Sequence, residues 1–169
     1  MSSNNYEIPH IIVALDYNKE NKALDMAKIL DPSLCILKVG LELYVSCGPK
    51  IVNALHKLGY KIFLDLKFHD IKNTVIKSSL VAADLGVWMI NVHSSGGVEM
   101  MSGVANTIKE NNYSTLVTGV TVLTSLDNDD IKTIGYSNNT KDQVMKMAAL
   151  CHDSGLNGIV CSAHEAKNI

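Results

Sequence analysis

The sequence predicts an α/β fold in which parallel strands alternate with helices. Short apolar runs recur along the chain, as expected of parallel strands that are buried on both faces. The first five runs begin about 24 to 29 residues apart, which is close to the length of one βα unit. The six runs are Ile11–Leu15, Cys35–Val39, Ile62–Leu66, Val87–Val92, Leu116–Leu123 and Ile159–Cys161. Because the 169 residues contain no linker or low-complexity segment, we expect one domain over residues 1–169.

Helical periodicity fills the segments between these runs. Ile51, Leu55 and Leu58 lie at i, i+4 and i+7, with Pro49 in the first turn and Gly59 after the last one. Three further apolar stripes predict a helix after the third strand, one after the fourth and one before the sixth. These stripes are Ile76, Leu80 and Ala83; Val98, Met101, Ala105 and Ile108; and Val144, Met147, Ala148 and Cys151. We interpret the stripes and Trp88 as core. Residues 124–140 form a long polar insertion after the fifth strand.

Strict alternation of strand and helix fits two architectures, an open doubly wound sheet and a (β/α)8 barrel. The first strand is followed by Leu15-Asp16-Tyr17-Asn18 rather than by a glycine-rich loop. That feature argues against a dinucleotide-binding sheet. A barrel would place its reactive groups at the carboxyl ends of several strands.

Composition excludes several classes of function. With a formal net charge of -2, the chain lacks the overall positive charge that is typical of proteins that bind nucleic acid. No apolar run approaches the roughly 20 residues of a membrane span, and the N-terminus shows no signal peptide. The four cysteines have no metal-ligand or disulfide-framework spacing, so we expect free thiols in a reducing cytoplasm. The six histidines are scattered, and no pair has metal-ligand spacing.

The segment Asp65–Thr74 is the most informative stretch. It brings the charged residues Asp65, Lys67 and Asp70 to the end of an apolar strand. In an extended chain alternate side chains point the same way, so an ammonium would lie beside a carboxylate. A solvated surface turn would explain this cluster equally well if it stood alone.

Polar residues at other strand ends favour a functional site. Lys38 lies within an apolar strand, where a lysine costs stability unless it is paired or reaches water. In a barrel, the carboxyl ends of all strands would converge on one mouth. The polar residues at these ends are Asp16, Lys38, Asp65 and Lys67, Asn91 and His93, and Thr121 and Thr124.

The stretch Phe63–Ile71 closely resembles the DxKxxD signature of the orotidine 5'-phosphate decarboxylase family. The resemblance covers nearly the whole chain and is closest to the bacterial branch. Its other segments are Val13–Asp16, Leu37–Gly40, Gly86–Met89, Asn91–Gly97, Val120–Ser125 and Val160–Ala163. It implies a homodimeric (β/α)8 TIM barrel that converts orotidine 5'-monophosphate to uridine 5'-monophosphate in pyrimidine biosynthesis, without metal or organic cofactor.

The resemblance also implies roles for individual residues. Lys67 would protonate carbon 6 as carbon dioxide leaves, and Asp65 would lie beside the substrate carboxylate. Asp70 would reach the partner subunit's site and complete an array with Lys38, Asp65 and Lys67. The other implied contacts are Asp16 and Lys38 to ribose hydroxyls, Thr124 and Ser125 to ribose or base, and Ile71 and Thr74 to the neighbouring site. His69 and His93 are interpreted as structural or loop-orienting residues.

The chain also departs from the family pattern. It contains about six of the eight βα units, so we expect a truncated or incompletely represented polypeptide whose own activity is open. The phosphate-binding residues of the family would lie beyond Ile169, and Lys72 stands where bacterial relatives usually have proline. Two alternatives stay open: a metal-using keto-sugar-phosphate decarboxylase or lyase of the same barrel group, and a non-catalytic fragment.

Overall fold

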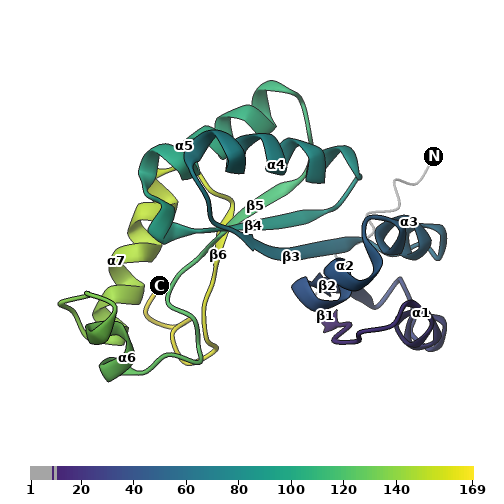
Figure 1. The fold of residues 1–169 in the computed structure, drawn as a ribbon, viewed down its shortest axis with the longest axis horizontal. Coiled ribbons are helices and arrows are strands. Elements are labelled where there is room, and N and C mark those ends of the chain that lie inside the picture. Colours follow the sequence, from purple (N-terminus) through teal and green to yellow (C-terminus); the bar gives the residue numbers. More distant parts are fainter. Residues whose placement is uncertain (1–8, 10) are drawn as a thin grey trace, which may run out of the picture. The chain divides into compact units, whose positions relative to one another are not determined.

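A computed structural model describes Pro9 and residues 11–169, and its contacts divide the chain into two compact units (Figure 1). Unit 1 ends at Asp65 and unit 2 begins at Leu66, so the division falls within the third strand. The N-terminal stretch, for which we predict no signal peptide, lies outside the described residues. The single domain over residues 1–169 stays a prediction.

Unit 1 is built on parallel strands in sequence order. Ile11 of β1 pairs with Cys35 of β2, and Leu37 of β2 pairs with Ile62 of β3. The elements of this unit are β1 (Ile11–Ala14), α1 (Glu20–Ile29), β2 (Cys35–Gly40), α2 (Leu41–Cys47), α3 (Lys50–Lys57) and the first part of β3 (Ile62–Phe68). The three predicted strands are therefore confirmed, and β3 ends at Phe68, two residues later than expected.

The helix predicted from Ile51, Leu55 and Leu58 is confirmed as α3. Ile51 and Leu55 are fully buried, whereas Leu58 follows the last turn and is 37% exposed. Gly59 has a φ of +90°, a backbone conformation that favours glycine after a helix end. The chain can therefore turn directly from α3 into β3.

Unit 2 continues the same alternation. Met89 of β4 pairs in parallel with Leu116 of β5, and Thr118 of β5 pairs with Gly158 of β6. Its elements are the end of β3, α4 (Lys72–Asp84), β4 (Met89–His93), η1 (Ser94–Gly96), α5 (Val98–Glu110), β5 (Leu116–Val120), α6 (Asn128–Thr133), α7 (Thr140–Asp153) and β6 (Gly158–Val160). All three remaining strands are confirmed, although β4 begins two residues later and β5 ends three residues earlier than predicted.

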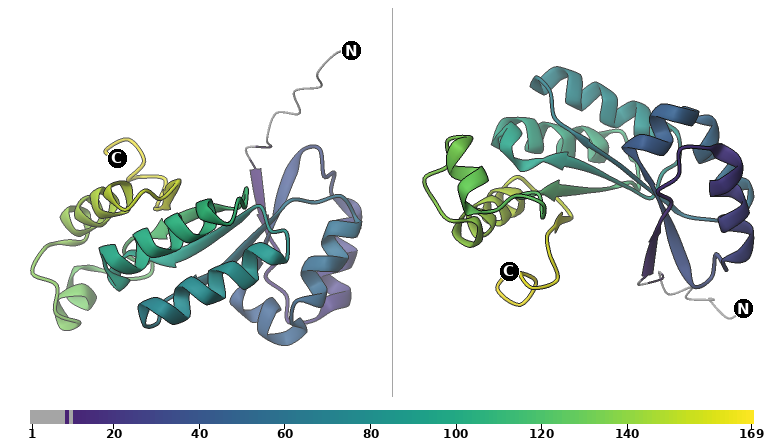
Figure 2. Two further views of the ribbon diagram at one scale, coloured as in Figure 1. Left: turned by 90° about the horizontal axis from the view of Figure 1, so that it is seen from above. Right: turned by 60° about the horizontal axis from the view of Figure 1, so that its bottom comes forward.

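Helices α4 and α5 lie side by side and pack against β4 and β5 (Figure 2). Gly103 permits this approach, since a methyl group there would lie 2.7 Å from a side-chain carbon of Ile76. The predicted core stripe of α4 is partly wrong: Ile76 and Leu80 are only half-buried, and Val75 and Ser79 are buried in their place. The buried face of α4 is thus shifted by one residue from the predicted stripe, and periodicity alone does not fix that rotation.

The predicted apolar stripes of α5 and α7 differ in how far they are buried. All four predicted residues of α7 are buried, whereas Val98 at the start of α5 is 44% exposed. Trp88 is only half-buried, so its interpretation as a core residue is wrong. It directly precedes β4, and its carbonyl accepts a 2.9 Å hydrogen bond from the Leu116 N–H of β5.

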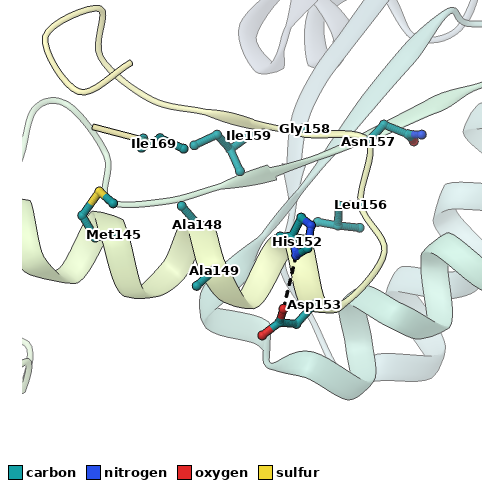
Figure 3. Close-up of a pocket in the computed structure, with 10 residues that line it drawn as sticks. All are labelled: Met145, Ala148, Ala149, His152, Asp153, Leu156, Asn157, Gly158, Ile159 and Ile169. Atoms are coloured by element: carbon teal, nitrogen blue, oxygen red, sulfur yellow. Dashed lines mark hydrogen bonds and ion pairs between the residues drawn. The ribbon is translucent and has the colours of Figure 1, made fainter. Parts of the chain in front are cut away.

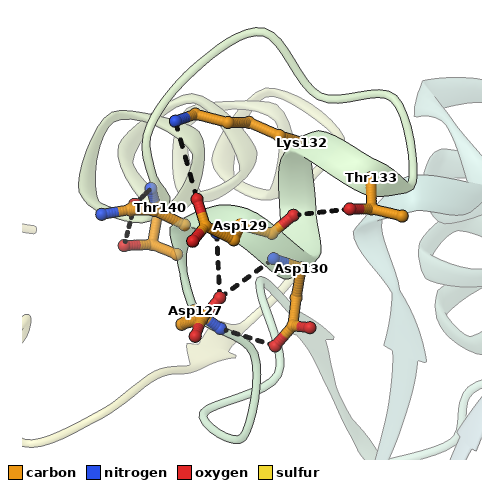
Figure 4. Close-up of polar contacts among 7 residues, drawn as sticks. Asp127, Asp129, Asp130, Lys132, Thr133 and Thr140 are labelled. Atoms are coloured by element: carbon orange, nitrogen blue, oxygen red, sulfur yellow. Dashed lines mark hydrogen bonds and ion pairs between the residues drawn. The ribbon is translucent and has the colours of Figure 1, made fainter.

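The polar insertion at residues 124–140 contains a short helix, α6, that the sequence analysis missed. Asp127 caps it: its carboxylate accepts hydrogen bonds at 2.9 Å from the backbone N–H groups of Asp129 and Asp130 (Figure 4). The Asp130 carboxylate in turn accepts a bond from the Asp127 N–H, which completes a capping box. Ile131 is fully buried and packs with Val144 and Met147 of α7.

We expect Asp127→Ala to lower the melting temperature by roughly 2–4 °C, because two helix N–H groups lose their acceptor. Thermal denaturation of the two proteins measures this loss. Asp129→Ala is the matched control, since it removes the same charge and only a weak exposed ion pair with Lys132, at 3.9 Å. Equal melting temperatures for wild type and Asp127→Ala would contradict the capping role.

Candidate active site

Lys38 lies between two carboxylates in unit 1. Its ammonium is 3.2 Å from Asp16 Oδ1 and 3.6 Å from Asp65 Oδ2. The Asp65 side chain is only 11% exposed and that of Lys38 is 21% exposed, whereas the Asp16 side chain is 72% exposed. Of the two expected possibilities for a lysine within this strand, an ion pair or a route to water, the structure shows the ion pair. The arrangement holds one cation of β2 between a buried anion of β3 and an open anion in the loop after β1.

Lys67 breaks the regular strand geometry in unit 2. Its φ is +53°, a left-handed conformation that costs a residue with a side chain about 1–3 kcal/mol. The expected alternation of side chains assumed an extended backbone through this residue, and the structure departs from it there. Such strain concentrates at functional sites, where the surrounding structure maintains it.

Asn91 of β4 contacts Lys67 directly. The Lys67 N–H donates a hydrogen bond of 2.8 Å to Asn91 Oδ1, and Asn91 has no exposed surface. The sequence places Asn91 at a strand end but does not identify it as a site residue. A polar amide inside the apolar run Val87–Val92 was the signal that could have identified it.

Two histidines lie close together in unit 2: His69 follows the end of β3, and His93 is the last residue of β4. The ring centroids of His69 and His93 are 5.2 Å apart. Burial and then the positive charges of His69 and Lys67 lower the pKa of His93 from 6.5. Both rings line a cavity of about 150 Å³, together with Thr121 and apolar side chains from the loop after β5 and from α6. Low polarity around the cavity favours the neutral imidazole of His93.

This lowered pKa makes stability depend on pH in a defined direction. Because unfolded His93 takes up a proton near pH 6.5 and folded His93 does so only at lower pH, acid favours unfolding. We expect stability to be full above pH 6.5 and to fall as pH drops below it. Denaturant unfolding at pH 7.5 and pH 5 should show a smaller acid loss in His93→Gln than in wild type.

His152→Gln is the control for this measurement, since the His152 side chain is 90% exposed. It should leave the pH dependence of wild type unchanged. An identical acid loss in wild type and His93→Gln would show that His93 does not carry the effect.

The remaining predicted residues lie at the surface. The Asp70 carboxylate accepts a 2.6 Å hydrogen bond from the Ile71 N–H, and the Ile71 residue is 74% exposed. Thr74 is exposed in the first turn of α4, and Thr124 and Ser125 are exposed in the loop after β5. Thr121, in contrast, is buried and donates to the Val160 carbonyl at 3.0 Å, which ties β5 to β6.

A larger cavity of about 490 Å³ lies elsewhere in unit 2, between α7 and β6 (Figure 3). Met145, Ala148 and Ile159 contribute apolar side chains to it. Its one charged pair, His152 with Asp153 at 3.3 Å, joins two adjacent and exposed residues. This cavity therefore offers no buried acid, base or cation. The candidate site residues are instead the Lys38 group of unit 1 and, in unit 2, Lys67 with its neighbours.

The described residues also show the state of the cysteines, the grouping of possible metal ligands and the character of the helices. All four cysteines are free thiols, as expected. Within Pro9 and residues 11–169, no group of three or more His, Cys, Asp or Glu side chains is arranged to hold a metal ion. None of the helices in that part of the chain has the length and apolar character needed to cross a membrane.

Parallel βα units with charged side chains on or just after the strands are typical of α/β enzymes. A family model described as "Orotidine 5'-phosphate decarboxylase / HUMPS family" matches residues 9–169. The chain therefore belongs to this family.

Curated relatives and solved structures agree with the match. The chain is 46% identical over 167 residues to the orotidine 5'-phosphate decarboxylase of Buchnera aphidicola, covering 99% of this chain and 71% of the relative. It is 51% identical over 156 residues to that of Alcanivorax borkumensis, covering 92% and 68%. The chain therefore spans about seven tenths of the length of these relatives. Both relatives are named as decarboxylases, which are carboxy-lyases.

The solved structures establish the fold. The crystal structure of orotidine 5'-phosphate decarboxylase from Lactobacillus acidophilus matches with a TM-score of 0.88 and 32% identity, over 96% of this chain and 75% of that one. An uncharacterized conserved protein from Geobacillus kaustophilus matches with a TM-score of 0.89 and 36% identity, over 94% and 76%. The predicted TIM-barrel fold class, with six βα units in this chain, is thereby confirmed.

Proposed function

We propose that the protein decarboxylates orotidine 5'-monophosphate to uridine 5'-monophosphate in pyrimidine biosynthesis. The observation that carries this proposal is the family match across residues 9–169, which includes the motif Asp65-x-Lys67-x-x-Asp70. The relatives at 46% and 51% identity are named for the same reaction.

The chemistry requires a cation at one carbon atom. When the bond from carbon 6 to the carboxylate breaks, carbon dioxide leaves and the electron pair stays on carbon 6, in the plane of the ring. The Lys67 ammonium would stabilise this charge and then donate its proton to carbon 6, after which the neutral amine takes up a proton from water. A preorganised charge of this kind acts only as the transition state forms, so it raises kcat rather than binding.

The carboxylates and the second lysine have supporting roles in this proposal. Asp65 would lie beside the substrate carboxylate, which leaves as neutral carbon dioxide. Asp16 and Lys38 would hold ribose hydroxyls; their 3.2 Å ion pair supports this, since it offers an acceptor beside a donor. Thr124 and Ser125, in an exposed loop, would contact ribose or base.

We include a homodimer in the proposal. Asp70, Ile71 and Thr74 would reach the partner's site, and the exposed apolar side chain of Ile71 supports a contact of that kind. Cytoplasmic location is also part of the proposal, supported by four free thiols, of which three are buried. The reaction as proposed uses no cofactor.

The test is to incubate the purified protein with orotidine 5'-monophosphate, with and without a metal chelator, and to follow uridine 5'-monophosphate by chromatography. We expect product at the same rate in both samples. A parallel sample with keto-sugar phosphates tests the alternative of a metal-using decarboxylase or lyase of the same barrel group. Product from those substrates alone, abolished by the chelator, would overturn the proposal, as would no product from any substrate.

A further inference from the structure

The backbone of Lys67 needs an external restraint. Among the described residues, only Lys67 and Asn112 combine a side chain with a positive φ. Asn112 follows the end of α5, and asparagine tolerates the left-handed region. Lysine has no short polar side chain that could hydrogen-bond its own backbone there. A contact from another part of unit 2 must therefore select this conformation.

Asn91 supplies that contact from a rigid position. Its Oδ1 accepts the Lys67 N–H at 2.8 Å, a short and well-formed hydrogen bond. Asn91 is fully buried, and its backbone pairs with Thr118 of β5 in the parallel ladder. The acceptor is thus fixed by a central strand, while the donor is at the end of β3. The side chain of Asn91 takes the place of a backbone acceptor at the point where the strand turns.

We propose that Asn91 is a positioning residue for the decarboxylation, which acts by holding the Lys67 backbone in its left-handed conformation. The inference rests on the proposed role of Lys67 as proton donor. A small displacement of a catalytic group can lower the rate by about 10²-fold. Loss of the acceptor should therefore affect the chemical step, in which the ammonium must meet carbon 6, more than substrate binding.

Two variants separate the hydrogen bond from the shape of the side chain. Asn91→Leu keeps the approximate size but removes the acceptor, and Asn91→Asp keeps an acceptor oxygen. Thr118→Val is the matched control, because it removes another buried polar contact of the same sheet, from Thr118 Oγ1 to the Ile90 carbonyl at 3.2 Å, without touching Lys67.

The first readout is hydrogen exchange at the Lys67 amide, which does not depend on turnover. We expect a protected amide in wild type, Thr118→Val and Asn91→Asp, and exchange at least about 10²-fold faster in Asn91→Leu. An unprotected Lys67 amide in the wild-type protein would overturn the inference without any variant. Equal protection in wild type and folded Asn91→Leu would also overturn it.

The second readout is the division between kcat and KM for orotidine 5'-monophosphate. We expect Asn91→Leu to lower kcat by about 10²-fold with KM within about threefold of wild type, and Asn91→Asp to recover at least about a tenth of wild-type kcat. Wild-type kcat in Asn91→Leu would contradict the positioning role. A wild-type protein with a protected Lys67 amide but no turnover would contradict the proposed function and leave the hydrogen bond established.

Discussion

Lys67→Ala should lower kcat for orotidine 5'-monophosphate by at least about 10⁴-fold, because it removes both the charge at carbon 6 and the proton donor. Nucleotide affinity should change by less than about tenfold, since the proposed interaction forms in the transition state. Steady-state kinetics and calorimetric titration with uridine 5'-monophosphate measure the two quantities.

Lys72→Ala is the matched control. Lys72 lies in the same segment, pairs with Glu99 at 3.0 Å and is 54% exposed, so its loss removes an equal charge without affecting the proposed chemistry. In Lys67→Ala the pKa of His93 should also rise, because Lys67 is one of the charges that lower it. A His93 pKa that nevertheless stays below 6.5, measured by NMR, shows that the variant is folded, because burial is the first cause of its lowering. Turnover above a tenth of wild type in Lys67→Ala would exclude Lys67 as the proton donor.

Gly119→Ala should destabilise unit 2 by about 1–3 kcal/mol through overpacking. A methyl group on Gly119 of β5 would overlap the sulfur of Cys151 and lie 3.0 Å from Leu156 Cδ1. Cys151 is 1% exposed, and its sulfur already contacts Met101 Sδ at 3.8 Å, so it has little space to move. The melting temperature should fall by roughly 2–4 °C for each kcal/mol.

Gly158→Ala on the neighbouring strand is the control, because its added carbon would make only an ordinary contact at 3.7 Å with Thr118. The double variant Gly119→Ala/Cys151→Ala should be more stable than the sum of its single changes, since the shorter side chain leaves space for the methyl group. Additive effects of the two changes would contradict the overlap.

The strands were predictable because burial on both faces leaves a continuous apolar run in the sequence. Their ends were not, because ladder pairing and local turns set them. The run Leu116–Leu123 continues past β5, for example, but the ladder ends at Val120, after which the Thr121 hydroxyl bonds to the Val160 carbonyl. Helix α6 was missed because a single buried residue, Ile131, anchors an otherwise polar segment.

The site was predictable where it depended on residue type and not where it depended on backbone conformation. A lysine in an apolar strand predicts a partner, and Lys38 has two carboxylates beside it. The left-handed φ of Lys67 and its bond to Asn91 arise from contacts 24 positions apart in the sequence. Periodicity and motif spacing carry no information about such a contact.

The measurement that tests the central claim most directly is decarboxylation in D₂O, followed by NMR of the product. The account predicts uridine 5'-monophosphate with deuterium at carbon 6, because the Lys67 ammonium exchanges its protons with solvent before it donates one. The signal of the hydrogen on carbon 6 should therefore be absent, and that of carbon 5 should lose its splitting. Product with hydrogen at carbon 6, or no product at all, would contradict the account.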